Sequence, residues 1–480
     1  MTRPLLSSAL LSVVLAAGPS LVPSAHAASY DPALTWRTLH TAHFNIHFHG
    51  GEEQLANEMS RMADPIWEEM TAELQWQPKR PIELVLVDNT DSANGYAMTL
   101  PVNSIVIFVT APTEDSTLGF YENWHELILT HELTHILHID HLGGLPKALR
   151  AVFGRIVSVN RISPGWVTEG FATFQETRHT TTGRGRASMA HMIKRVAVLE
   201  DEFPPLSNLD GYQVAPPAGN LRYLFGQDFQ AYVAETYGDD TWTRFVHQYG
   251  RWVLPWVLPG KRTFGKGLPP LYREWRDAMS ARYTAQAAEL EAEGLTPFTL
   301  LSDGVDQCAA PNYSPDSARI VWSCYDPNEG PAIWLADGAG ENAVKKLDQR
   351  FATDFGWRAD GEAFAFSALH VVDRFNTYND VYYYELNGTF SALTNGDRAR
   401  NPAFSPDGRE LLVVTNDVQN NQVKRVTIDQ RVVELIGPED HTQYSTPAGP
   451  PTVATLRCRC GKKGAGTSGF TTLTALPCAA

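Results

Sequence analysis

Hydrophobic positions follow two different periods along this chain. Up to about residue 290, short apolar runs alternate with stretches in which apolar residues recur every three or four positions, as expected of an α+β region. Residues 54–74 have the helical period and predict an amphipathic helix that is interrupted near Pro65. Three short apolar runs predict strands: residues 44–48, 82–87 and 104–109.

Two later segments also have a helical pattern. Residues 121–141 predict a long helix, which the glycine pair at 143–144 ends. A second helix is predicted to begin near Ser163 and Pro164, because serine suits the N-cap and proline suits the first turn.

After Thr296 a different unit recurs: an aromatic residue, two further residues, Asp, and then Gly or Ser. It occurs three times, at Tyr313–Ser317, Trp357–Gly361 and Phe404–Gly408. Each copy precedes two strand-like runs, as in hairpins that turn at Asp-Gly. The copies are spaced by 44 and 47 residues, which suits the blades of a β-propeller. An ordinary β-sandwich with incidental Asp-Gly turns is the alternative.

These copies resemble the TolB-like or PD40 propeller repeats, which carry a similar SPDG turn. Three repeats are too few for a closed propeller of about four to eight blades, so the sequence predicts an incomplete propeller at residues 296–440. A fourth copy begins at Tyr444, but strand alternation is then lost. Residues 441–480 are therefore interpreted as a disordered tail, or as a truncated or frame-shifted end.

The N-terminus has the form of a secretory signal peptide of the bacterial type. Arg3 precedes an apolar run from Leu5 to Ala17, and the small residues Ala25 and Ala27 predict cleavage after Ala27. We therefore expect a periplasmic or secreted protein. No other stretch approaches about 18 apolar residues, so no integral membrane segment is expected after cleavage.

Composition narrows the classes of partner. With a formal net charge of −15, the protein lacks the basic excess that a phosphate backbone needs, so no nucleic-acid partner is expected. All five cysteines lie after residue 300, and Cys308 and Cys324 could pair across neighbouring strands in an oxidising compartment. The three later cysteines leave one thiol over.

Candidate chemistry concentrates in the stretch HELTHILHIDH at residues 131–141. On a helix, His131 and His135 lie about 40° apart around the axis and can bind one metal ion from the same face. The H-E-x-x-H spacing indicates zinc, with Glu132 acting on the zinc-bound water instead of on the metal. Such a site needs a third protein ligand and keeps its fourth position for water.

Two residues are candidates for the third ligand. His141 would give a metzincin-like pattern, but that pattern has glycine where this chain has His138, and a continuing helix would carry His141 away. Glu169, in PGWVTEGFATFQE at 164–176, could face the first helix and complete a His2Glu site. His125, His138 and His141 then stay unassigned: they could support the metal ligands from behind, or they could lie on a solvated face, which is the expectation for His141.

The stretch around Glu169 resembles the W-L-x-E-G-F-A-x-F helix of M1-type gluzincin aminopeptidases and related families of that clan. The resemblance implies three zinc ligands and a general base: His131, His135, Glu169 and Glu132. Residues 220–238 resemble the clan's Y-x-x-G helix, which implies that Tyr223 donates a hydrogen bond to the oxyanion. Two departures leave exopeptidase specificity open: 33 residues separate the second histidine from the third ligand, and the sequence has no G-x-M-E-N segment.

Together these patterns predict an α+β zincin-like metallopeptidase domain followed by an all-β, incomplete β-propeller-like domain. The expected order is a signal peptide, a peptidase domain, propeller repeats and a tail, at residues 1–27, 28–295, 296–440 and 441–480. The predicted function is zinc-dependent hydrolysis of a peptide or protein substrate outside the cytoplasm, with a protein partner on the propeller repeats. The alternative is a catalytically inactive protein that binds through the propeller.

Overall fold

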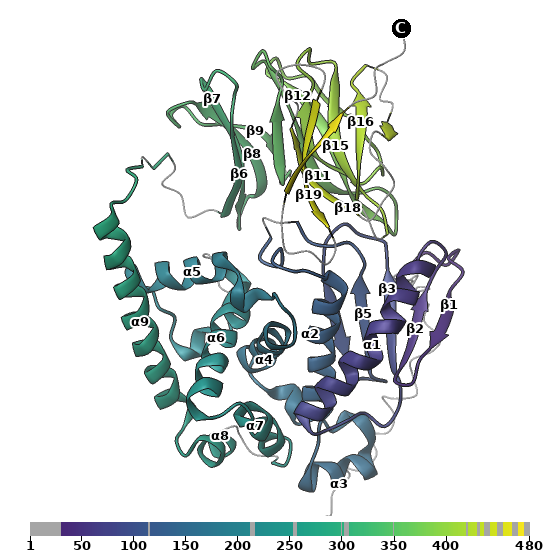
Figure 1. Ribbon diagram of the computed structural model, residues 1–480, viewed down its shortest axis with the longest axis vertical. Helices are drawn as coiled ribbons and strands as arrows, with labels where there is room; N and C mark the ends of the chain where they lie inside the picture. Colours follow the sequence, from purple (N-terminus) through teal and green to yellow (C-terminus); the bar gives the residue numbers. More distant parts are fainter. Residues whose placement is uncertain are drawn as a thin grey trace, which may run out of the picture. The chain divides into compact units, whose positions relative to one another are not determined.

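The computed structural model describes residues 30–474, except for a set of short segments: 114–115, 212–216, 253–256, 299, 302–306, 349, 419–420, 430–432, 436–441, 449–454 and 463–468 (Figure 1). The chain divides into two compact units, Met1–Leu34 and Thr35–Ala480. The predicted boundary at residues 295 and 296 lies inside the second unit and stays a prediction. The signal peptide predicted at residues 1–27 lies outside the described residues.

A five-stranded sheet organises the first part of the second unit. Its strands lie in the order β1 (Arg37–His40), β2 (Phe44–Phe48), β3 (Ile82–Val87), β5 (Ser104–Phe108) and β4 (Gly95–Met98). β2, β3 and β5 are parallel, whereas β1 and β4 are antiparallel strands at the two edges. The three strands predicted from apolar runs are confirmed as β2, β3 and β5.

Helices pack on this sheet and on one another, joined by one set of buried apolar side chains. They are α1 (Glu53–Leu74), α2 (Trp124–Ile139), α3 (Gly144–Phe153), α4 (Gly165–His179), α5 (Ser188–Leu199), α6 (Leu221–Tyr237), α7 (Thr241–Tyr249), α8 (Val257–Phe264) and α9 (Leu268–Glu293). Short 3-10 turns are η1 (Gly154–Ile156), η2 (Asn160–Ile162), η3 (Arg184–Arg186), η4 (Leu206–Asn208) and η5 (Ala218–Asn220). Within the described residues, no helix has the length and apolar character needed to cross a membrane.

α1 continues through Pro65, so the predicted interruption is wrong. Proline removes one backbone donor and costs a helix interior roughly 3 kcal/mol. The apolar face of α1 stays buried on both sides of Pro65, at Met59, Ala63 and Trp67. Burial of this face against the sheet keeps the helix intact.

α2 is shorter than the predicted range of 121–141. It begins after Asn123, whose side chain accepts hydrogen bonds from the backbone N–H groups of His125 and Glu126. It ends at Ile139. The asparagine cap fixes the start of the helix that carries the H-E-x-x-H residues.

α4 and α6 cross at two glycines. A Cβ atom on Gly170 would lie 2.6 Å from the carbonyl carbon of Gly226, so only glycine permits this approach. α4 begins at Gly165 with Pro164 at the N-cap and no capping side chain, so the predicted cap by Ser163 is wrong. The close crossing fixes the two helices that carry the predicted third ligand and the predicted oxyanion donor.

Beyond α9 the described chain forms open antiparallel sheets in which each strand pairs with its neighbours in sequence (Figure 1). The first contains β6 (Gln307–Tyr313), β7 (Arg319–Asp326), β8 (Gly330–Asp337) and β9 (Val344–Asp348). The second contains β10 (Asp354–Trp357), β11 (Ala363–Val371), β12 (Thr377–Glu385) and β13 (Phe390–Ala392). The third contains β14 (Ala399–Phe404), β15 (Glu410–Asn416), β16 (Asn421–Thr427) and β17 (Val433–Leu435).

A three-stranded sheet follows, of β18 (Thr442–Ala448), β19 (Thr455–Lys462) and β20 (Gly469–Thr474). Regular structure therefore occurs within residues 441–480, which were predicted to be disordered. These strands are rich in threonine, whose β-branched side chain favours extended backbone even without apolar alternation.

The three repeated turns join the first two strands of their sheets, as predicted. In each, the aspartate side chain accepts a backbone N–H from two residues ahead, and the residue after the aspartate has a positive φ. These φ angles are 58° at Ser317, 70° at Gly361 and 71° at Gly408. Ser317 occupies a conformation that glycine adopts with less strain.

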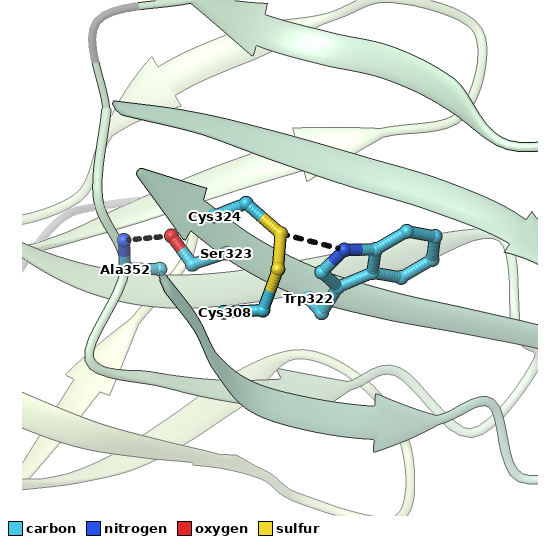
Figure 2. Close-up of a disulfide and its surroundings, with 5 residues drawn as sticks. All are labelled: Cys308, Trp322, Ser323, Cys324 and Ala352. Atoms are coloured by element: carbon cyan, nitrogen blue, oxygen red, sulfur yellow. Dashed lines mark hydrogen bonds between the residues drawn. A yellow bond between two sulfur atoms is a disulfide. The ribbon is translucent and has the colours of Figure 1, made fainter. Parts of the chain in front are cut away.

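Cys308 and Cys324 form the disulfide that strand pairing predicted, at opposite positions of β6 and β7 (Figure 2). The indole N–H of Trp322 donates to the Cys324 sulfur at 3.1 Å, and the Ser323 hydroxyl accepts the Ala352 N–H at 2.9 Å. The side chains of the three later cysteines lie outside the described residues.

Arg398, at the start of the third sheet, bonds to the segment between β3 and β4. Its guanidinium nitrogens lie 2.8 Å from Asp88 Oδ2 and 2.8 Å from Asp91 Oδ1, and a third contact reaches Thr110 Oγ1 at 2.7 Å. Burial opposes its charge, but the two aspartates outweigh burial and raise the pKa of Arg398. The arginine is therefore tied to the loop that leads into edge strand β4.

Candidate metal centre

α2 directs two imidazoles toward one point. The Nε2 atoms of His131 and His135 lie 3.2 Å apart, and the two ring planes meet at 86°. Both rings are buried. One helical turn separates the residues, so the backbone alone is sufficient to bring the two nitrogens together.

Glu169 reaches the same point from α4. Its Oε2 atom lies 3.2 Å from Nε2 of His135 and 3.6 Å from Nε2 of His131. Two imidazole nitrogens and a carboxylate oxygen at these distances match the His2Glu donor set of zinc sites. The structure thus brings together the three residues predicted as ligands, and they could hold a metal ion.

Glu132 of α2 borders the same point. The ligand atoms of His131, Glu132 and His135 all lie within 4.8 Å of one another. Glu132 Oε2 is buried and has no hydrogen-bond partner among the described residues. A Cβ atom on Gly95 would lie 3.2 Å from Glu132 Oε1, so this carboxylate lies against edge strand β4.

The pKa values of Glu169 and Glu132 are shifted in opposite directions. Burial opposes ionisation of Glu169, but His135 and His131 outweigh burial and hold the pKa of Glu169 far below its usual range. At Glu132 burial prevails and raises the pKa of the carboxyl. A metal ligand must be ionised, whereas a proton acceptor works best with a raised pKa. This difference fits Glu169 as a ligand and Glu132 as a base.

The imidazole of His131 tends to take up a proton at the point where a metal cation would bind. Burial and the charge of Arg184 lower the pKa of His131, but hydrogen bonds to Glu169 and Glu176 outweigh them and raise it to about 9. Without a metal ion, His131 therefore favours its protonated form near neutral pH. A divalent cation can replace that proton and satisfy the same carboxylate.

Glu176 and Arg184 contact the Nδ1 atom of His131, on the side of the ring away from His135. Neither residue was predicted from the sequence. Glu176 Oε2 lies 2.8 Å from His131 Nδ1, and Arg184 Nε donates to Glu176 Oε1 at 2.8 Å. All three side chains are buried. Glu176 follows Glu169 by seven residues on α4, two turns along one face, so helical spacing could have identified it. No local pattern indicates Arg184.

The Nδ1 atom of His131 has two close neighbours. Arg184 Nη2 also lies 2.8 Å from it and donates to Glu176 Oε2 at 2.6 Å. A guanidinium only donates and a carboxylate only accepts, so the tautomer of His131 decides between them. We assign the Nδ1 proton to the bond with Glu176, because Arg184 already has an acceptor there. The Nε2 lone pair of His131 is then free for a metal.

Tyr223 of α6 lies beside the imidazole pair. Its ring centroid is 6.3 Å from that of His131, and the guanidinium carbon of Arg184 lies 4.7 Å from the Tyr223 centroid. Burial, followed by the charge of Glu169, raises the pKa of Tyr223 to about 12. The phenol therefore keeps its proton near neutral pH and can act as a hydrogen-bond donor, while its catalytic role stays a prediction.

His141 lies apart from the group of described residues that could hold a metal ion. The expectation of a solvated face is wrong, because His141 is 5% exposed and its ring stacks on His247 with centroids 4.2 Å apart. After α2 the chain turns back, and the N–H of Gly143 donates to the carbonyl of Gly250 at 3.0 Å. This turn covers the imidazole and leaves the metzincin-like alternative without structural support.

The two unassigned histidines are core residues. His125 Nε2 lies 3.1 Å from the Val109 carbonyl oxygen, and His138 packs edge-on against Phe171 with centroids 5.7 Å apart. Burial, and then the charge of His135, lowers the pKa of His138 to about 3. His138 therefore stays neutral at physiological pH.

No protein-family model and no curated protein matches this chain. Among solved structures, a protein described as TolB from Agrobacterium tumefaciens matches with 17% identity and a TM-score of 0.30, over 37% of this chain and 80% of that chain. TolB from Acinetobacter baumannii matches with 14% identity and a TM-score of 0.30, over 36% of this chain and 45% of that chain.

A prolyl endopeptidase structure matches with 17% identity and a TM-score of 0.28, over 36% of this chain and 27% of that chain. This chain thus spans less than half of two of the three structures. Likenesses this weak carry no argument about activity, so the functional argument depends on the site itself.

Proposed function

We propose that this protein is a zinc-dependent hydrolase that cleaves peptide bonds outside the cytoplasm. The observation that carries the proposal is the convergence of His131 Nε2, His135 Nε2 and Glu169 Oε2, with the unpartnered Glu132 carboxylate beside them. His131, His135 and Glu169 would hold the metal. Zinc, when bound, supplies a Lewis acid that polarises a carbonyl and lowers the pKa of a bound water.

Glu132 acts as the general base in this proposal. Its raised pKa suits a group that accepts a proton from the attacking water and then passes it to the leaving amine nitrogen. Its lack of a competing hydrogen-bond partner leaves the carboxylate free for water. Tyr223 donates its O–H to the carbonyl oxygen as negative charge develops there.

Edge strand β4 supports a peptide as the substrate. β4 pairs with β5 on one side and forms the end of the described sheet on the other. The free backbone groups of such a strand can align an extended peptide by β-pairing. Gly95 of β4 lies against Glu132, so a peptide on this edge would pass next to the base.

Two further features support the proposed location outside the cytoplasm and a protein partner. The Cys308–Cys324 disulfide suits an oxidising compartment, in agreement with the predicted signal peptide and a periplasmic or secreted location. The open sheets after residue 306 offer unpaired strand edges to a protein partner, in agreement with TolB-like repeats.

Metal analysis combined with cleavage of a broad peptide library tests the proposal. We expect about one zinc per chain in the wild type, and cleavage that a chelator abolishes. Glu169→Ala should lose most of the metal, whereas the matched variant His141→Ala should keep it. Absence of zinc from a zinc-supplemented sample would disprove the metal site. Bound zinc without cleavage of any peptide would favour the inactive binding protein.

A further inference from the structure

Residues 144–162, which follow the H-E-x-x-H helix, expose an unusual number of apolar side chains. Nine large apolar side chains of the described chain are 61–88% exposed, and five of them belong to this segment: Leu145, Val152, Phe153, Ile156 and Ile162. Soluble surfaces rarely gather apolar groups this densely without a partner. Figure 1 shows α3, which carries the first three, at the periphery of the helices.

The same segment is basic in an acidic protein. Between Asp140 and Glu169 the sequence contains no acidic residue and four cations, whereas the whole chain has a net charge of −15. Arg80 adds to the positive field at Arg155, and Arg251 joins Lys147 in the field at His141. The four cations of the segment are Lys147, Arg150, Arg155 and Arg161.

Side-chain bonds hold the segment in a fixed shape. Arg155 donates to the Thr99 carbonyl at 2.8 Å, and Arg161 donates to the Thr99 hydroxyl at 2.7 Å. Arg150 and Arg155 both pair with Asp140. Because these bonds engage only one acid, most of the positive charge of the segment stays uncompensated.

We propose that residues 144–162 dock this protein on an anionic lipid surface. α3 has ten residues and is about 15 Å long, too short to span a bilayer and long enough to lie in its interface. Exposed Val, Phe and Ile side chains would enter the boundary between headgroups and acyl chains, while the exposed Lys147 faces lipid phosphates and the bonded arginines add to the positive field. The acidic remainder of the protein would be repelled, which orients this face toward the membrane.

Charge favours lipid over a second copy of this chain as the occupant. In a symmetric dimer this face would meet itself, so Lys147 and its basic neighbours would approach like charges across the interface. An anionic bilayer instead offers negative charge over the whole patch. The docking also needs no metal, so its test is independent of the proposed hydrolase activity.

Vesicle binding of the full-length chain tests this proposal, with vesicles of phosphatidylcholine alone or mixed with phosphatidylglycerol. We expect binding to the mixed vesicles that weakens as salt increases. Phe153→Ser/Ile156→Ser should weaken vesicle binding at least about tenfold, because two apolar side chains that would be buried in the bilayer are lost. Lys147→Glu should weaken it roughly tenfold. The control, Phe298→Ser/Leu300→Ser, removes similarly exposed side chains elsewhere and should bind like the wild type.

Hydrogen exchange, measured peptide by peptide, locates the contact and separates it from any binding by the N-terminus. Protection of residues 144–162 on mixed vesicles alone supports the proposal. Equal binding of wild type and Phe153→Ser/Ile156→Ser, or protection only elsewhere, disproves it. A lipid-independent dimer that the same double variant dissociates also disproves it, because a second copy would then cover this face.

Discussion

The Nδ1 atom of His131 lies 2.8 Å from Oε2 of Glu176, an acid two helical turns beyond the predicted ligand Glu169. Carboxylates in this position orient a histidine and raise its basicity toward a metal. Glu176→Gln keeps an acceptor oxygen but not the charge, so it should lower zinc affinity about 10- to 100-fold and keep the fold at a lower stability, because the buried Arg184 loses its counter-charge. Competition with a chelator of known affinity measures this effect.

Glu176→Ala serves as the contrasting variant. It leaves the buried Arg184 with neither the negative charge nor an acceptor oxygen at this position, so it should destabilise the protein more than Glu176→Gln does, by about 3–5 kcal/mol. Denaturant unfolding measures this loss. Unchanged zinc affinity in Glu176→Gln would show that the glutamate has only a structural role.

Glu132→Gln should retain zinc and the fold but cleave peptides about 10² to 10⁴ times more slowly, because the amide cannot accept the proton from water. Metal analysis and kcat of the same preparation test both statements. Full activity in this variant would show that the proposed mechanism is wrong.

Tyr223→Phe should lower kcat by about 10² to 10³ and change KM little, because the phenol is needed chiefly when the carbonyl oxygen becomes negative. Tyr232→Phe, on the same helix, is the matched control and should behave like the wild type. The opposite result, loss in Tyr232→Phe alone, would mean that the oxyanion donor had been assigned to the wrong tyrosine.

His141 should make the protein less stable in acid. Burial lowers its pKa to about 3 from 6.5, and His247, His138, Arg251 and Lys147 add to the effect. The unfolded chain therefore binds the proton first as pH falls below 6.5. The free energy of unfolding should decrease by up to about 1.4 kcal/mol per pH unit for this residue down to about pH 3.

Denaturant unfolding between pH 4 and 7 measures that slope, with a chelator in every sample so that metal release does not contribute. His141→Gln cannot take up the proton and should show a shallower slope than the wild type, whatever its absolute stability. Equal slopes would contradict the prediction.

Local spacing allowed much of this structure to be predicted. His131 and His135 are one helical turn apart, so their convergence follows from the backbone of α2. The Asp-Gly turns fix their hairpins in the same way, because aspartate and the positive φ act within a few residues. Strand order in the first sheet had no such local signal, since β3 pairs with β5 and not with β4.

Contacts between distant residues explain what sequence reasoning missed. Arg184 is 53 residues from His131, and Arg398 is 307 residues from Asp91. His141 is a polar residue just after a helix, where exposure is the usual outcome. Contacts with His247 of α7 and with Trp76, both far along the chain, bury it. Pro65 follows the same logic, because tertiary packing overrides a local helix breaker.

The Cys308–Cys324 disulfide joins two residues 16 positions apart within one hairpin. It therefore closes a short loop of the unfolded chain, an effect of roughly 3 kcal/mol. Because every described sheet after residue 306 pairs strands adjacent in sequence, the strand pairing of each sheet can form before the next sheet is made, whereas the apolar core between the first two sheets needs both. The covalent bond can thus be completed in the first sheet independently of how many sheets follow.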